Sequence, residues 1–180
     1  HRSFIHQSNL SLSEKTSLII TKLTPSIIEF DPKLLIVQGD TNSSLASSLI
    51  SFYSKIPLAH VEAGLSSGQI MDPFPEEINR RLISQMASLN FAPTDYEASN
   101  LKSLGAHGEI HVTGNTIVDS VKLIEGNLPE FFLKNVNLSN KKLILATFHR
   151  RDNWGKNLEY ISSGILKVIN NFPNVVFIIP

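Results

Sequence analysis

The sequence predicts an α/β protein in which helices cover a parallel β-sheet. Short apolar runs alternate along the chain with amphipathic stretches, which is the rhythm of repeated strand–helix units. The first run, residues 34–37, is short and continuous and is followed by Gly39-Asp40, as is typical of a buried strand. The rhythm breaks at residues 126–140, where Gly, Pro and several Asn residues gather, and then restarts.

The elements follow in order from these patterns. The first predicted helix, 43–53, carries Leu45, Leu49 and Phe52 at helical spacing, and the second, 75–89, starts at a proline, which suits a first helical position. The remaining predicted helices are 94–104, 116–123 and 158–170. Apolar runs predict the strands 34–37, 57–62, 90–92, 110–113, 142–147 and 175–179.

The break at 126–140 predicts two domains. We expect residues 1–125 to form an N-terminal Rossmann-like domain and residues 126–140 to be an interdomain connection. Residues 141–180 are then the start of a second Rossmann-like domain.

Composition excludes several function classes. Lys+Arg and Asp+Glu both number 16 in 180 residues, so the net charge gives no argument for nucleic acid or for an anionic membrane. There is no cysteine, which excludes disulfides and thiolate zinc sites and fits a reducing compartment such as the cytoplasm. No apolar run is long enough to span a bilayer. The chain starts without Met and without a signal-peptide pattern, so we expect it to begin in mid-sequence.

Three carboxylates lie where strands end or a helix begins. They are Asp40, Glu62 and Glu76. Ligands of open parallel sheets bind beyond the carboxyl ends of the strands, so this placement indicates acid/base chemistry in a cleft. For Asp40 the competing explanation, equally weighted, is that it or a neighbour caps the next helix. Glu62 ends an apolar strand, where an unpaired carboxylate is costly, so we favour a functional role.

Glu76 and Glu77 are each followed at i+4 by an arginine, Arg80 and Arg81. The simplest explanation is two exposed helical ion pairs worth about 0.3–0.5 kcal/mol each, and it suffices for one of them. The rigid Pro-Phe-Pro entry suits a helix start that carries a site residue. His60 is predicted to be a half-buried strand residue with a satisfied ring and not a ligand.

Loops supply the other candidates. His149-Arg150-Arg151 lies between a strand and a helix, and is either a solvated basic loop or a site for a diphosphate. Residues 64–68 are either an active-site loop or a plain surface loop, and residues 114–116 are a turn with an N-cap. No cluster has metal-ligand spacing, and no GxGxxG or P-loop pattern occurs.

Six motifs follow one another in a specific order. They are Val37-Gln38-Gly39-Asp40-Thr41, His60-Val61-Glu62-Ala63-Gly64-Leu65, Pro73-Phe74-Pro75-Glu76-Glu77-Ile78-Asn79-Arg80, Phe91-Ala92-Pro93-Thr94, Val112-Thr113-Gly114-Asn115-Thr116 and His149-Arg150-Arg151-Asp152-Asn153. From about residue 11 to its end, the chain resembles the non-hydrolysing UDP-N-acetylglucosamine 2-epimerases of bacteria.

The resemblance implies a two-domain fold of the glycosyltransferase B type with its active site between the domains. It also implies interconversion of UDP-GlcNAc and UDP-ManNAc through a 2-acetamidoglucal for envelope polysaccharides, without cofactor or metal. Asp40, Glu62 and Glu76 would then be the acid/base residues, and Arg80 would organise them. His149, beside Arg150, would contact the diphosphate. Relatives are commonly dimers, so a homodimer is expected, and the expected location is the cytoplasm.

The chain departs from the family pattern in two places. The first strand with its phosphate turn is absent, and Ser66 stands where the family usually has Arg. The open alternatives are therefore an epimerase for a modified UDP-sugar such as a diacetamido uronic acid, a glycosyltransferase on the same fold, and a non-catalytic nucleotide-sugar-binding domain. Because much of the second domain is also missing, we expect this polypeptide alone not to be a competent enzyme.

Overall fold

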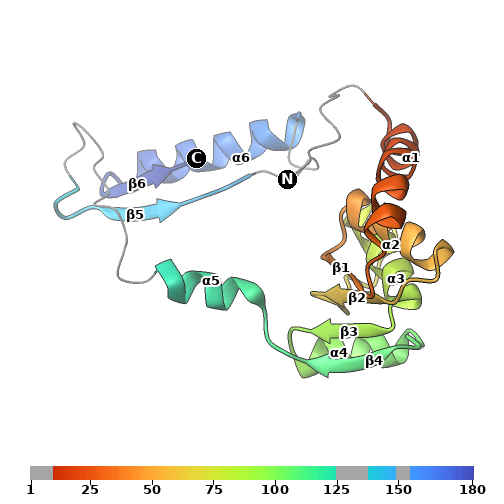
Figure 1. The fold of residues 1–180 in the computed structure, drawn as a ribbon. Helices are drawn as coiled ribbons and strands as arrows, with labels where there is room; N and C mark the ends of the chain where they lie inside the picture. The colour runs from red at the N-terminus through yellow and green to blue at the C-terminus, as the bar shows by residue number, and fades with distance from the viewer. Residues whose placement is uncertain (1–9, 125–137, 149–154) are drawn as a thin grey trace. The chain divides into compact units, whose positions relative to one another are not determined.

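The structure, a computed structural model, describes residues 10–124, 138–148 and 155–180 (Figure 1). The chain divides into two compact units, His1–Asn127 and Leu128–Pro180. The described elements are α1 (Leu12–Phe30), β1 (Leu35–Gln38), α2 (Asn42–Tyr53), β2 (Leu58–Val61), α3 (Glu76–Met86), β3 (Leu89–Ala92), α4 (Asp95–Ser103), β4 (Glu109–Val112), α5 (Thr116–Ile124), β5 (Lys142–Leu145), α6 (Lys156–Asn171) and β6 (Val175–Ile178).

A parallel sheet in the order β1-β2-β3-β4 forms the centre of the first unit. Val37 is level with His60, His60 with Asn90, and Asn90 with Ile110, so these four side chains form one row across one face. Gln38 is level with Val61, which brings the carboxyl ends of β1 and β2 to the same edge. The predicted α/β class with parallel strands is confirmed.

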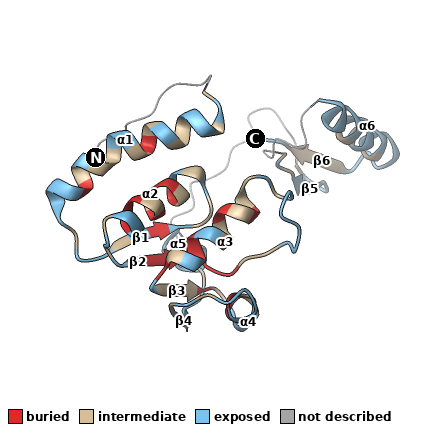
Figure 2. Cartoon of the chain, turned by 90° about the vertical axis from the view of Figure 1, so that its right-hand side faces the viewer, coloured by how far each residue is buried: buried red, intermediate tan, exposed pale blue. Residues whose placement is uncertain are grey.

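The core lies between this sheet and the helices α2, α3 and α4. Val37 and Leu58 on the strands pack with Ile83 and Ala87 of α3 and its end. Figure 2 shows buried residues concentrated on α2, α3 and the central strands. Leu58 and Ile83 are almost inaccessible to solvent, and burying each stabilises the fold by about 1.5–3 kcal/mol. This packing fixes α3 against β2, and α3 carries most of the charged residues discussed below.

Helix α1 was not predicted, although its start carries a recognisable signal. Ser11 accepts a hydrogen bond from the Glu14 backbone amide, and the Glu14 side chain accepts one from the Ser11 amide, which is a capping box. The helix ends at Asp31 in the left-handed conformation, with φ of 46°.

Helix α3 is shorter than predicted. It ends at Met86 because Ala87 adopts an extended conformation. The Ser88 amide then donates to the carbonyl of Leu58, so the chain joins the sheet and Leu89 is the first residue of β3. The predicted helix 75–89 was therefore too long at its C-terminal end.

The second unit contains the parallel pair β5 and β6 and the helix α6. This matches the predicted strand–helix–strand restart, with α6 beginning two residues earlier than expected. Residues 126–137 of the expected interdomain connection lie outside the described residues. No helix in the described part of the chain is long and apolar enough to cross a membrane.

Candidate active site

A tight turn follows β1 and places Asp40 at the carboxyl edge of the sheet. Gly39 has a φ of 68°, a conformation that glycine adopts without steric cost. Thr41, and not Asp40, caps α2, since its hydroxyl accepts a hydrogen bond from the Ser44 amide. The helix cap that was the competing explanation for Asp40 is therefore its neighbour Thr41. The Asp40 carboxylate is available to another partner.

That partner is Arg80 of α3. The Arg80 Nε atom donates to Asp40 Oδ2 at 2.9 Å, and its Nη2 donates to the same oxygen. Both side chains are largely buried, with 12% of Arg80 and 21% of Asp40 exposed. Because this shielding strengthens the attraction, the pair fixes the carboxylate more firmly than an exposed ion pair would.

Glu62 lies directly after β2, beside the Asp40 turn. It has a φ of 62°, which is uncommon for a residue with a side chain. Its Oε2 lies 3.6 Å from the point that a Cβ atom at Gly39 would occupy. Among the described residues, Glu62 forms no ion pair or hydrogen bond. The strand ends thus bring Asp40 and Glu62 close together, as predicted. Arg80 holds the Asp40 carboxylate, whereas the Glu62 carboxylate has no ion-pair or hydrogen-bond partner among the described residues.

Of the two exposed helical ion pairs predicted for Glu76 and Glu77, the first does not form and the second is not exposed. Glu76 is half-buried in the first turn of α3 and forms no ion pair within the described part of the chain. Arg80 bonds to Asp40 and Glu77 instead. The Glu77–Arg81 pair forms, but it is buried and not exposed.

Glu77 is a central residue of the site that the sequence did not identify. Its side chain is fully buried. The carboxylate accepts four hydrogen bonds, from Ser66 Oγ at 2.7 Å, the Ser67 amide at 3.0 Å, Arg81 Nε at 2.8 Å and Arg80 Nη1 at 3.0 Å. Burial alone would raise the pKa of Glu77. The hydrogen bonds and the two arginine charges outweigh burial and lower the pKa to about 2. The only sequence signal was one carboxylate with arginines at both i+3 and i+4.

Glu77 also anchors the loop between β2 and α3. Ser66 and Ser67 bind its two carboxylate oxygens, and the Gly64 carbonyl accepts a hydrogen bond from Asn100 of α4. A Cβ atom at Gly64 would lie 2.3 Å from the backbone oxygen of Glu97, so only glycine allows this close approach. The loop 64–68 is therefore tied to two helices beside Asp40 and Glu62. In the next predicted loop, Asn115 accepts a hydrogen bond from the Ile117 amide, as expected of a turn with an N-cap.

His60 is more buried than predicted, and its ring is satisfied as predicted. It is fully inaccessible to solvent, with Nε2 2.9 Å from the Gly39 carbonyl and Nδ1 3.3 Å from Ser84 Oγ. Burial lowers the pKa of His60 below its usual 6.5, and the nearby Arg80 acts in the same direction. The Gly39 contact and the charges of Asp40 and Glu62 oppose this shift without cancelling it.

This environment predicts how stability depends on pH. Below pH 6.5 the unfolded chain protonates His60 more readily than the folded protein, so the free energy of unfolding should fall as the pH drops. The maximum slope for one proton is about 1.4 kcal/mol per pH unit. Urea unfolding of the full-length protein between pH 5 and 7.5 should show this slope in the wild type and less of it in His60→Gln. Ser51→Ala, which removes a buried hydroxyl and no ionisable group, is the control and should keep the wild-type slope. Equal slopes in all three proteins would contradict the prediction.

The two remaining candidates, His149 and Arg150, lie outside the described residues. Among the residues that the structure describes, no group of three or more His, Asp or Glu side chains could hold a metal ion.

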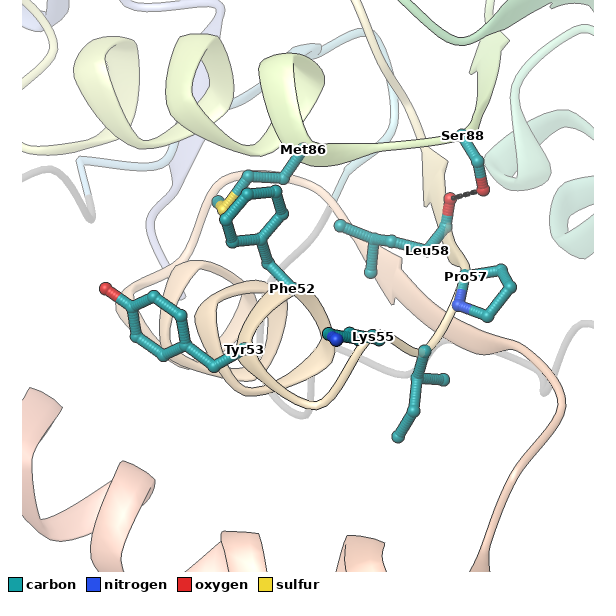
Figure 3. A pocket seen from close by; sticks show the side chains of 8 residues that line it. Phe52, Tyr53, Lys55, Pro57, Leu58, Met86 and Ser88 are labelled. Carbon is teal, nitrogen blue, oxygen red and sulfur yellow. Dashed lines mark hydrogen bonds between the residues drawn. The ribbon is translucent and has the colours of Figure 1, made fainter.

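An apolar hollow of about 580 Å³ lies elsewhere on the first unit (Figure 3). Phe52 and Tyr53 at the end of α2 line it together with Leu58 and Met86. Leu58 is the first residue of β2, whereas Glu62 follows the last, so the hollow is at the opposite end of the strand from the carboxylates. It is not part of the candidate active site.

Comparison with known proteins gives a consistent result. The sequence matches the family described as UDP-N-acetylglucosamine 2-epimerase over residues 2–180. A UDP-N-acetylglucosamine 2-epimerase of Neisseria meningitidis is 38% identical over 184 residues, covering 98% of this chain and 50% of the relative. One from Yersinia pestis is 37% identical over 178 residues, covering 94% and 47%. The chain thus spans about half the length of the curated relatives it matches.

Solved structures agree with the sequence matches. The Neisseria meningitidis UDP-GlcNAc 2-epimerase, solved with UDP-GlcNAc bound, has a TM-score of 0.82 and 36% identity, with coverage of 98% of this chain and 50% of that chain. The Staphylococcus aureus protein MnaA, solved with UDP, has a TM-score of 0.86 and 40% identity, with coverage of 95% and 47%. The similarity of fold therefore extends over nearly the whole of this chain.

Proposed function

The chain belongs to the UDP-N-acetylglucosamine 2-epimerase family, and we propose that the full-length protein interconverts UDP-GlcNAc and UDP-ManNAc at C2 of the sugar. The observation that carries the proposal is the meeting of Asp40 and Glu62 at adjacent strand ends, with Arg80 holding the first. Glu76, at the start of the same helix as Arg80, supplies a third carboxylate. No nicotinamide or metal is needed for this reaction.

The chemistry suits these residues. A carboxylate takes the proton from C2, the electron pair of that C–H bond forms the C1=C2 double bond, and the C1–O bond breaks to release UDP. A UDP oxygen then attacks C1 of the 2-acetamidoglucal, and a proton is delivered to the other face of C2. Such a reaction requires carboxyl groups able to exchange protons on two faces. Asp40, Glu62 and Glu76 are the proposed acid/base residues.

The remaining parts of the proposal concern the diphosphate contact, the connection between the domains, the oligomeric state and the location in the cell. His149 and Arg150 are proposed to contact the diphosphate, because a basic loop between a strand and a helix suits that group. Residues 126–140 are proposed to connect two Rossmann-like domains of the glycosyltransferase B type. We further propose a homodimer in the cytoplasm, serving synthesis of an envelope polysaccharide.

The test is proton NMR of UDP-GlcNAc with the full-length protein in deuterated water. Appearance of UDP-ManNAc carrying deuterium at C2 is the expected result, because the C2 proton exchanges with solvent during each turnover. Release of free ManNAc and UDP would contradict the non-hydrolysing reaction. No change with UDP-GlcNAc would contradict the proposed substrate, and a diacetamido uronic acid UDP-sugar would be the next one to try.

A further inference from the structure

The turn that carries Asp40 is held by side chains from three different elements. Three consecutive carbonyl groups each accept a side-chain hydrogen bond: Gln38 from Ser44 Oγ of α2 at 2.8 Å, Gly39 from His60 Nε2 of β2 at 2.9 Å, and Asp40 from Asn79 Nδ2 of α3 at 2.9 Å. Connecting segments normally run over the surface, where water can reach their carbonyl groups. Here each has its own donor.

The three donors are all buried, with exposed fractions of 8% for Ser44, 0% for His60 and 2% for Asn79. Burying a polar side chain is costly unless it is hydrogen-bonded, and these side chains are bonded to the turn. The arrangement therefore restrains the backbone of the turn, while Arg80 restrains the Asp40 carboxylate.

The hydrogen bonds determine the tautomer of His60. A carbonyl oxygen can only accept, so Nε2 must carry the proton that it donates to Gly39. In the neutral ring Nδ1 is then an acceptor, and the hydroxyl of Ser84 is its donor at 3.3 Å. Ser84 lies one helical turn after Arg80 on α3. Helix α3 thus restrains the Asp40 turn at three points. Asn79 and Arg80 bind the turn directly, and Ser84 acts on it through His60.

We propose that His60 is a positioning residue, which holds the Gly39 carbonyl from β2 so that the Asp40 carboxylate keeps the orientation required for proton transfer. Ser84 acts through His60 by fixing the tautomer. The inference rests on the proposed epimerase function, because it gives Asp40 its task. In this role His60 acts on the Asp40 carboxylate through the Gly39 carbonyl, and it does not itself transfer a proton.

The consequence is a specific kinetic effect. A displacement of about 1 Å at a reacting group can lower the rate roughly 10²-fold. His60→Ala should therefore lower kcat for deuterium exchange at C2 by about 100-fold while KM for UDP-GlcNAc changes less than about threefold. His60→Gln, whose amide can donate to Gly39 and accept from Ser84, should recover at least about tenfold of that loss.

Ser84→Ala provides a second and milder variant, since it removes the hydroxyl that fixes the tautomer but leaves the ring in place. We expect kcat to fall by about three- to tenfold. Ser51→Ala is the matched control. Ser51 is also a fully buried helical serine whose hydroxyl donates to a carbonyl, that of Ile56, but it lies near the amino end of β2. Its kcat should equal that of the wild type.

Amide hydrogen exchange followed by mass spectrometry completes the test without relying on turnover. Peptides covering residues 35–45 should exchange faster in His60→Ala than in the wild type, while those covering β4 should not change. Unchanged kcat and unchanged exchange in a folded His60→Ala or Ser84→Ala protein would overturn the inference. Absence of deuterium exchange at C2 in the wild-type protein would instead refute the proposed function, so the two failures are distinguishable.

Discussion

Replacing Glu77 with alanine is expected to destabilise the first unit by about 3–5 kcal/mol, the cost of removing one partner from a buried ion pair. The variant leaves the guanidinium groups of Arg80 and Arg81 without this shared carboxylate. It also leaves Ser66 Oγ and the Ser67 amide without their acceptor. Hydrogen exchange in peptides covering residues 62–86 of the full-length protein should report the loss directly, together with a lower urea midpoint.

Glu76→Ala is the matched control for this prediction. The two glutamates are neighbours in the first turn of the same helix, and Glu76 forms no ion pair within the described part of the chain. We expect Glu76→Ala to change stability by less than about 1 kcal/mol. Equal effects of the two substitutions would show that the buried ion pairs and hydrogen bonds of Glu77 do not contribute the stability ascribed to them.

Lowering the pH should reduce the difference in the free energy of unfolding between the wild type and Glu77→Ala. The folded-state pKa of Glu77, about 2, is below the ordinary value of 4.5, so its contribution is fully present above pH 4.5. It declines as the pH falls from 4.5 through about 2, where the folded protein also takes up the proton. The stability difference should therefore narrow across that interval, and a difference that stays constant would contradict the assignment.

The sequence was sufficient for most of the strands because most of them carry a short apolar run, and several are followed by a turn residue. Helix α1 was not predicted, although the Ser11–Glu14 capping box at its start is a recognisable helix signal. The prediction also placed the end of α3 too late. Ala87 and Leu89 are apolar and suit either a helix or a strand, and the deciding interaction is the Ser88 hydrogen bond to Leu58, 30 residues away.

The site could be predicted only in part, for a geometric reason. Asp40 and Glu62 follow strands that a parallel sheet must bring to one edge, so topology alone predicts their proximity. Glu76 and Glu77 differ by one residue on a helix, which is a rotation of about 100°, and both have an arginine at i+4. Which of them turns inward depends on how α3 packs through Ile83 on the sheet, and this packing buries Glu77.

Asp40→Asn and Glu62→Gln should each lower the rate of epimerisation by roughly 10²–10⁴-fold, the usual contribution of a general acid or base. Both changes keep the size of the side chain and remove its capacity to take a proton at neutral pH. In Asp40→Asn, Arg80 retains Glu77 as a partner, so the fold should persist. The rate is measured as appearance of UDP-ManNAc from UDP-GlcNAc with the full-length protein in deuterated water.

The two variants test different parts of the site, because Asp40 is held by Arg80 whereas Glu62 is unengaged among the described residues. Deuterium exchange at C2 can be followed separately from epimerisation. If one carboxylate removes the proton and the other returns it on the opposite face, the variant lacking the second should still exchange deuterium into one epimer while forming little of the other. Glu109→Gln, at an exposed carboxylate of β4, should turn over at the wild-type rate. Near-normal turnover in both Asp40→Asn and Glu62→Gln would refute the acid/base assignment of these two residues, because each substitution removes the group that was assigned to proton transfer.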